Sequence, residues 1–197
     1  MLIPVKDFRQ AKARLAGVVP AADRIRLARW TAELVVAAAA PLPVFVACDD
    51  EDVAEWATSV GATVLWRPSV GLNAAVLDGI AALAAAGIEH AIVAHSDLPL
   101  PSPLAGVVMT GGIVLVPDSR SDGTNVLAVP TSAGFQPAYG SQSFHRHLAH
   151  AMGLGLPVRV LRDPGLALDI DTPADLAHPL VAKALPSWLR TNQASPQ

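Results

Sequence analysis

The sequence predicts a Rossmann-like, three-layer α/β fold in which a mostly parallel, mixed sheet lies between helices. Strand-like and helix-like segments alternate four times in the first half of the chain, a pattern typical of a parallel, doubly wound sheet. The length of 197 residues fits one domain, and a hydrophobic content of 52% is enough to build a sizeable core.

Short apolar runs predict the strands of the first half. The run at 44–48 is continuously apolar, as expected for a strand that is covered on both faces. The run at 2–5 contains Pro4, which a sheet tolerates near an edge or at a strand end. The predicted strands of this half are 2–5, 44–48, 63–66 and 91–94.

Helical periodicity and stop signals predict the helices between these strands. In the first helix apolar residues recur at helical spacing, and Pro41 and Pro43 end it. Asp49 and Asp50 can cap the second helix, and Gly61 can end it. The predicted helices of this half are 22–40, 52–60 and 72–86.

The second half of the chain is less regular. A cap, a proline and an acid at Thr172, Pro173 and Asp175 predict a helix start. Beyond residue 185 the chain turns polar, so we expect a single domain over 1–185 and a flexible tail over 186–197. The further predicted elements are strands at 113–116, 126–129 and 158–161 and a helix at 143–152.

Composition argues against several classes of protein. The net charge of −3 and the pI near 6.0 do not fit the basic footprint of a nucleic-acid binder. No apolar stretch approaches the roughly 20 residues of a membrane-spanning helix. Cys48 is the only cysteine, so an intrachain disulfide is excluded. The first residues do not resemble a signal peptide, and we therefore expect a cytoplasmic protein.

A basic cluster follows the first predicted strand. Lys6, Lys12 and Arg14 lie where ligands bind in parallel sheets, beyond the carboxyl end of a strand. Lysine and arginine can neutralise the phosphates of a nucleotide during transfer. The alternative is a solvated basic loop without a ligand.

Carboxylates occur at two places that could share a metal ion. Asp97 directly follows the fourth predicted strand, and Asp169 and Asp171 lie two residues apart near the end of the chain. Mg²⁺ favours one or two carboxylates together with phosphate oxygens. The alternatives are local roles, with Asp97 capping the short segment at 101–104 and Asp171 capping the helix that follows it.

A small-anion pocket is predicted from the second half. Gly123 allows a close backbone approach, the hydroxyls of Thr124 and Ser143 can donate to anionic oxygens, and Ser143 begins a helix. Ordinary turn and cap chemistry is the alternative. His145 and His150 are expected to be partly exposed helix residues, with His147 as the exception among the three histidines of this helix.

Six motifs in order give the chain a resemblance to a known family. It resembles the 2-phospho-L-lactate or phosphoenolpyruvate guanylyltransferases of deazaflavin coenzyme F-420 biosynthesis, over residues 2–176. The motifs that carry the resemblance are Ile3-Pro4-Val5-Lys6 with Ala11-Lys12-Ala13-Arg14-Leu15, Gly71-Leu72-Asn73-Ala74-Ala75-Val76, Ser96-Asp97-Leu98-Pro99-Leu100, Pro117-Asp118 with Gly123-Thr124-Asn125, Tyr139-Gly140 with Ser143-Phe144 and His147, and Leu168-Asp169-Ile170-Asp171-Thr172-Pro173.

The resemblance implies a fold, a reaction and a set of site residues. The fold is that of the molybdenum-cofactor guanylyltransferases and is nucleotide-diphospho-sugar transferase-like. The co-substrate is GTP, the cofactor is Mg²⁺, and the acceptor is phosphoenolpyruvate or 2-phospho-L-lactate. The implied residues are Lys6, Lys12, Arg14 and Asp97 for catalysis, Gly71, Leu72, Asn73 and Ser96 for the nucleotide, Thr124, Gly140 and Ser143 for the acceptor, and Asp97, Asp169 and Asp171 for the metal.

Some questions stay open at this point. The acceptor could be phosphoenolpyruvate, 2-phospho-L-lactate or 3-phosphoglycerate. The rival functions are a nucleotidyltransferase for molybdopterin or a sugar phosphate, a glycosyltransferase that uses Asp169 and Asp171, and a GTP-binding protein without catalysis. A basic residue expected before Tyr139 is missing, so Arg120 or Arg146 would take its role. The oligomeric state is open, a homodimer included, and a separate enzyme is expected to take the reactive product onward.

Overall fold

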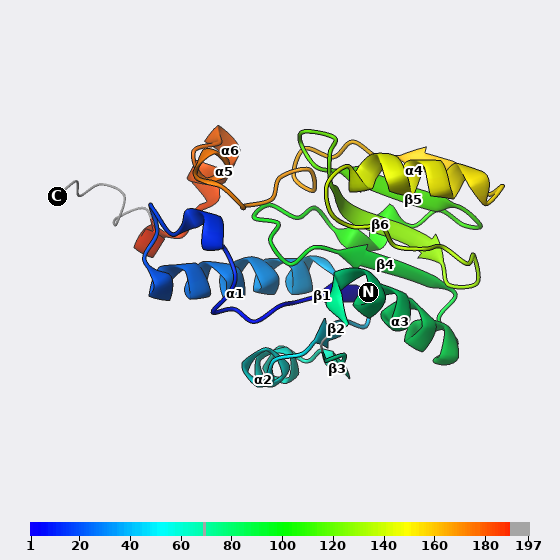
Figure 1. The fold of residues 1–197 in the computed structure, drawn as a ribbon, viewed down its shortest axis with the longest axis horizontal. Coiled ribbons are helices and arrows are strands. Elements are labelled where there is room, and N and C mark those ends of the chain that lie inside the picture. The colour runs from blue at the N-terminus through cyan, green and yellow to red at the C-terminus, as the bar shows by residue number, and fades with distance from the viewer. Residues whose placement is uncertain (69, 190–197) are drawn as a thin grey trace.

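A computed structural model describes residues 1–68 and 70–189 of the chain. In this part a seven-stranded sheet has the order β3-β2-β1-β4-β6-β5-β7 (Figure 1). The strands are β1 (Leu2–Pro4), β2 (Phe45–Cys48), β3 (Thr63–Trp66), β4 (His90–Ala94), β5 (Ile113–Pro117), β6 (Thr124–Pro130) and β7 (Val158–Val160). The helices are α1 (Ala21–Ala38), α2 (Glu51–Ser59), α3 (Gly71–Ala85), α4 (Ser143–Gly153), α5 (Pro173–Leu176) and α6 (Pro179–Ala184), with 3-10 turns η1 (Ala13–Leu15) and η2 (Leu104–Val107).

Helices cover both faces of the sheet, as the sequence predicts. Alternate residues of each strand point to opposite faces. One face packs against α1 and α2, and its core includes Ile3, Val46 and Ile92. The other face packs against α3 and α4, and its core includes Leu2 and Val93. Both layers are mostly apolar, which matches the continuous apolar runs of the central strands.

One strand reverses the direction of the sheet. β6 pairs antiparallel with both β4 and β5, whereas every other pairing is parallel. The sheet is therefore mixed and mostly parallel. Pro4 lies at the end of the central strand β1, where no further ladder hydrogen bond from its nitrogen is needed.

The predicted caps are partly confirmed. Asp50 caps α2 by accepting a hydrogen bond from the Val53 amide, whereas Asp49 does not cap it. Thr172 and Asp175 form a capping box at the start of α5. The short segment after Asp97 becomes η2, and the carboxylate of Asp97 makes no cap there.

A third apolar cluster joins the end of the described chain to its beginning. We call it the C-terminal cluster, and Figure 1 shows α5 and α6 beside the start of α1. Leu189 is only 1% exposed, so residues up to 189 pack on the domain although the tail is expected from residue 186. The rest of that predicted tail, 190–197, lies outside the described residues. The members are Leu15, Val19, Leu27, Leu168, Ile170, Leu176, Val181, Leu185 and Leu189.

None of the helices in the described part of the chain is long and apolar enough to cross a membrane. This agrees with the absence of a long apolar stretch in the sequence.

Candidate active site

A cavity of about 410 Å³ opens at the carboxyl ends of β1, β2 and β4. Its volume is in the usual range of small-molecule sites. The loops that follow these strands supply its polar wall, as expected for a parallel sheet. Of the predicted residues, Lys6, Lys12, Gly71, Leu72, Ser96, Asp97 and Asp171 line it.

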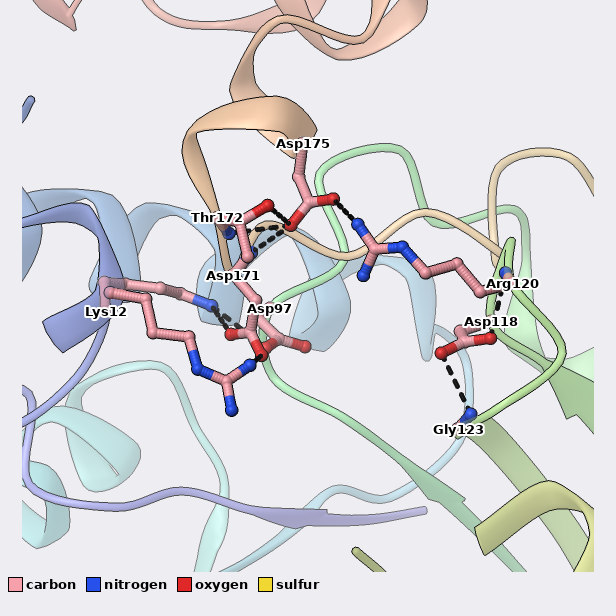
Figure 2. A network of polar contacts seen from close by, with 9 residues as sticks. Lys12, Asp97, Asp118, Arg120, Gly123, Asp171, Thr172 and Asp175 are labelled. Carbon is pink, nitrogen blue, oxygen red and sulfur yellow. Dashed lines mark hydrogen bonds and ion pairs between the residues drawn. The ribbon is translucent and has the colours of Figure 1, made fainter. Parts of the chain in front are cut away.

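Lys12 is the buried cation of this cavity. Its ammonium Nζ lies 2.9 Å from Asp97 Oδ2 and 3.6 Å from Asp171 Oδ1, and only 5% of its side chain is exposed. Figure 2 shows the lysine directed between the two carboxylates. Its backbone is left-handed, with φ of 58°. That conformation costs a non-glycine residue roughly 1 kcal/mol or more, and such strain is common at functional sites.

The other two predicted cations are more exposed. Arg14 lies near the rim, 75% exposed, with Nη1 at 3.7 Å from Asp171 Oδ2. Lys6 is exposed on the wall of the cavity. Both side chains can therefore swing toward a phosphate chain, whereas Lys12 is fixed in place.

Three carboxylates form the acidic part of the site. Oxygens of Asp97, Asp169 and Asp171 lie within 4.8 Å of one another. Burial raises the pKa of Asp97, but the charges of Lys12 and His95 and the hydrogen bond from Lys12 outweigh burial, so the net pKa is below its ordinary value. Burial and the repulsion of Asp97 and Asp171 raise the pKa of Asp169 to about 7.

This cluster fits a divalent cation. Asp97 Oδ1 is buried and has no hydrogen-bond partner within the described residues. Burial and the repulsion of Asp97 and Asp171 raise the pKa of Asp169, so a third negative charge in this cluster is unfavourable without a further cation. A hard cation bound by oxygens would satisfy both the unpaired atom and the excess charge. Asp171 is therefore part of the acidic site rather than a helix cap.

Replacing Asp169 by asparagine should make the metal-free protein more stable above pH 7. Asp169 is protonated up to about pH 7 in the folded state, against 3.8 ordinarily. The contribution of Asp169 to the stability of the wild type thus falls as pH rises from about 4 through 7, because the folded state binds the extra proton. At pH 8 the free energy of unfolding of the variant should exceed that of the wild type by ~1 kcal/mol, a value that allows for solvent screening of the charges. The corresponding rise in thermal midpoint is roughly 2–4 °C.

The measurement is thermal unfolding at pH 4.5 and pH 8, with and without saturating MgCl₂. The gain from the substitution should shrink at pH 4.5, and Mg²⁺ should stabilise the wild type more than the variant. Asp52→Asn, the same change at an exposed position of α2, serves as the control. Identical pH profiles for wild type and Asp169→Asn would contradict the prediction.

The N-terminus of α3 also faces the cavity. Gly71 has a φ of +73°, which favours glycine, and among the described residues no side chain caps the helix. The first backbone N–H groups of α3 thus have no partner within the helix, and they carry the positive end of its dipole. Gly71 and Leu72 line the cavity as predicted.

Asn73 does not line the cavity. The sequence predicts it as a nucleotide ligand, but its Oδ1 accepts from the Tyr139 amide at 2.6 Å and its Nδ2 donates to the Tyr139 carbonyl at 3.4 Å. This side chain instead ties α3 to the loop before α4. The contact spans 66 residues of sequence, so no local signal could have indicated it.

Asp49 is a cavity residue that the sequence analysis did not assign to the site. It follows β2 and lines the cavity together with Arg67, which follows β3. Within the described residues its carboxylate has no hydrogen bond or ion pair. Its place after a central strand was the available signal, but its neighbour Asp50 made capping the simpler interpretation.

The residues predicted to bind the acceptor substrate, Thr124, Gly140 and Ser143, lie close together at a second location. This second location is next to the cavity but outside its lining. The Thr124 amide donates to Ser143 Oγ at 3.1 Å, and the Ser143 amide donates to the Gly140 carbonyl. Thr124 and Ser143 are both buried. Arg146 Nη2 donates to the carbonyls of Ala138 and Tyr139, so this arginine lies against the same loop.

The loop between β5 and β6 lies between the second location, formed by Thr124, Gly140 and Ser143, and the acidic cluster. Asp118 accepts from the amides of Arg120, Asp122 and Gly123. A Cβ atom at position 123 would lie 2.9 Å from that carboxylate, so a larger residue would displace the side chain of Asp118. Arg120 reaches across to Asp175 at 2.7 Å (Figure 2), which makes Arg146 rather than Arg120 the arginine beside Gly140.

Solved structures confirm the predicted fold. A protein from Desulfovibrio desulfuricans described as a nucleotide-diphospho-sugar transferase has a TM-score of 0.74 and 16% identity, over 98% of this chain and 91% of that chain. A nucleotidyl transferase from Methanothermobacter has a TM-score of 0.66 and 16% identity, over 96% of this chain and 97% of that chain.

Sequence comparison defines the class and then the family. A protein named phosphoenolpyruvate guanylyltransferase from Sphaerobacter thermophilus is 36% identical, over 89% of both chains. One of the same name from Rubrobacter xylanophilus is 34% identical, over 90% of this chain and 91% of that one. Fold, site and relatives together define an enzyme of the nucleotidyltransferase class. A family model described as guanylyl transferase CofC like matches residues 1–182, and the chain belongs to that family.

Proposed function

We propose that this protein is a Mg²⁺-dependent guanylyltransferase that transfers GMP from GTP to the phosphate of phosphoenolpyruvate or 2-phospho-L-lactate, in coenzyme F-420 biosynthesis. The observation that carries the proposal is the buried Lys12 ammonium held between Asp97 and Asp171 on the wall of the cavity. The names of the relatives support phosphoenolpyruvate as the acceptor.

In the proposed reaction a phosphate oxygen of the acceptor attacks the α-phosphorus of GTP. A new P–O bond forms, the bond from the α-phosphorus to the oxygen bridging to the β-phosphate breaks, and pyrophosphate leaves with the electron pair. The acceptor phosphate is largely ionised at neutral pH, since its second pKa is ~6. The enzyme therefore needs no general base.

The task of the protein is to bring two anions together. Lys12 is fixed for this purpose, while Lys6 and Arg14 can follow the phosphates as they move. Positioning the reactants and neutralising the charge that develops lowers the barrier of such transfers. Asp97 and Asp169, with Asp171, would hold Mg²⁺, which when bound would neutralise phosphate oxygens.

The experiment that tests this function measures pyrophosphate release from purified protein, GTP and MgCl₂. Phosphoenolpyruvate, 2-phospho-L-lactate and 3-phosphoglycerate are added in turn, and mass spectrometry identifies the product. Release that depends on one acid, with a guanylylated product, is the expected result. Release with none of the three acids would contradict the proposal and favour a molybdopterin or sugar-phosphate acceptor, or GTP binding without catalysis.

We expect Asp49 to select guanine. Guanine presents two donors, N1–H and N2–H₂, to which one carboxylate can bond, whereas adenine presents an acceptor at N1. Asp49→Ala should lower kcat/KM for GTP by roughly 10- to 100-fold, the value of hydrogen bonds to a charged group. Activity with ATP should not fall.

Competition between GTP and ATP in the pyrophosphate assay is the measurement. Glu51→Gln, an exposed acid in the first turn of α2, serves as the matched control and should leave the preference unchanged. An Asp49→Ala protein with the full preference for GTP would refute this role for the carboxylate.

A further inference from the structure

His147 is a buried histidine that the proposed reaction does not use. It lies on α4 and is 0% exposed, with the rings of Phe135 and Tyr139 packed against it. Both ring nitrogens have partners. The Ala138 amide donates to Nε2 at 2.8 Å, and Nδ1 lies 2.9 Å from Thr124 Oγ1.

These two contacts define the tautomer of the ring. A backbone N–H can only donate, so Nε2 must be the unprotonated nitrogen. Burial and the neighbouring charges of Arg146, His95 and His150 lower the pKa of His147 to about 4, so the ring is neutral near pH 7. A neutral imidazole carries one hydrogen, and here it must be on Nδ1. Nδ1 therefore donates to Thr124 Oγ1.

The direction of this hydrogen bond determines what the Thr124 hydroxyl can do. A hydroxyl has one hydrogen to donate and two lone pairs to accept with. Because Oγ1 accepts from His147, its own hydrogen is not used in that contact. Ser143 is arranged in the same way, since its Oγ accepts from the Thr124 amide. Within the described residues neither hydroxyl hydrogen has a hydrogen-bonded acceptor.

We propose that His147 is a positioning residue for the acceptor, because its Nδ1–H holds Thr124 Oγ1 as an acceptor and leaves the threonine hydroxyl hydrogen for an anionic oxygen of the phospho-acid. This inference rests on the proposed function, in which Thr124 and Ser143 bind the acid. A histidine with the hydrogen on Nε2 would instead accept from Thr124 and remove that donor. The ring acts through Thr124 and does not touch the substrate.

Two substitutions separate the two hydrogen bonds of the ring. In His147→Asn the amide Nδ2 can replace Nδ1 as the donor to Thr124, but nothing accepts from Ala138. In His147→Gln the amide oxygen can replace Nε2 as the acceptor from Ala138, but the donor to Thr124 is lost. The proposal therefore predicts that the Gln variant is impaired and that the Asn variant recovers most of the loss.

The measurement is KM for phosphoenolpyruvate and for GTP in each variant, with thermal unfolding as a check on folding. His147→Gln should raise KM for the phospho-acid about 10-fold and change KM for GTP by less than twofold. Thr124→Val should have the same effect, and the double variant should be no worse than either single one.

Different failures have different meanings. A normal Gln variant with an impaired Asn variant would mean that His147 acts through the Ala138 loop, and would overturn the proposal. Equal changes in both KM values would mean a merely structural role and would overturn it as well. A wild type that uses no phospho-acid would overturn the proposed function and this inference together. Histidine ¹⁵N chemical shifts of the wild type add a test that needs no variant, since an Nε2–H tautomer would refute the inference.

Discussion

Replacing Asp97 by asparagine is expected to lower kcat by about 10³-fold and to change the thermal midpoint by less than ~3 °C. The loss is of the size seen when a group that stabilises transition-state charge is removed. Asp97 Oδ1 is the buried oxygen without a partner, which makes it the first choice as a ligand for the divalent cation. An asparagine keeps the shape and can still accept from Lys12.

The fold should tolerate this change because two electrostatic effects oppose each other. The variant loses the attraction between Asp97 and Lys12, but it also loses the repulsion between Asp97 and Asp169. The experiment is steady-state turnover at several MgCl₂ concentrations together with thermal unfolding. Asp52→Asn should behave as wild type, and an Asp97→Asn protein with turnover within threefold of wild type would exclude this role.

Replacing Lys12 by methionine is expected to reduce both stability and activity. The change leaves Asp97 and Asp171 without their buried cation, and unpaired buried charge costs several kcal/mol. Since Asp97 and Asp171 are partly exposed, we expect a loss of ~2 kcal/mol, or about 4–8 °C in thermal midpoint. Turnover should fall by about 10²-fold, because the fixed positive charge beside the phosphates is gone.

The pH dependence gives this prediction a definite sign. Lys12 holds the pKa of Asp97 below its ordinary value, so the pair stabilises the fold above about pH 4 and loses that effect as the pH falls. The deficit of Lys12→Met should therefore be fully present near neutral pH and shrink as the pH falls below about 4, and MgCl₂ should recover part of it. Lys6→Met, the same change at an exposed lysine, should leave the midpoint unchanged. A deficit independent of pH and Mg²⁺ would indicate lost packing alone.

Local signals were sufficient for most elements of the fold. Apolar runs and stop residues located the strands of the first half within one or two residues. Burial explains the continuous apolar runs of the central strands, whereas the edge strand β3 is only partly buried. The capping box at Thr172 and Asp175 could also be predicted from the sequence, because its two partners are only three residues apart. The antiparallel direction of β6 was not predicted by any local pattern. Strand direction depends on pairing between residues far apart in the sequence.

Some residues of the candidate site could be predicted from the sequence, and others could not. Asp97 and Lys12 could be placed together because both follow strands of a parallel sheet, whose carboxyl ends share one edge. The left-handed backbone of Lys12 could not be predicted, because most lysines avoid that conformation. The family resemblance implied a nucleotide-binding role for Asn73, but its side chain is hydrogen-bonded to the backbone of Tyr139. Asp49 was not predicted as a cavity residue, because both Asp49 and its neighbour Asp50 could be interpreted as caps of α2.

The C-terminal cluster has a consequence for the order in which the protein is completed on the ribosome. Leu15, one residue after Arg14, finishes its packing against Leu168, Leu185 and Leu189, which are synthesised late. A nascent chain that has already made β1 to β4 therefore has the strands around the cavity but still lacks the late members of the cluster that contains Leu15. Domains generally fold as units during synthesis. The chain should thus stay catalytically silent until almost all of the described residues have emerged, so a truncated product would not consume nucleotide.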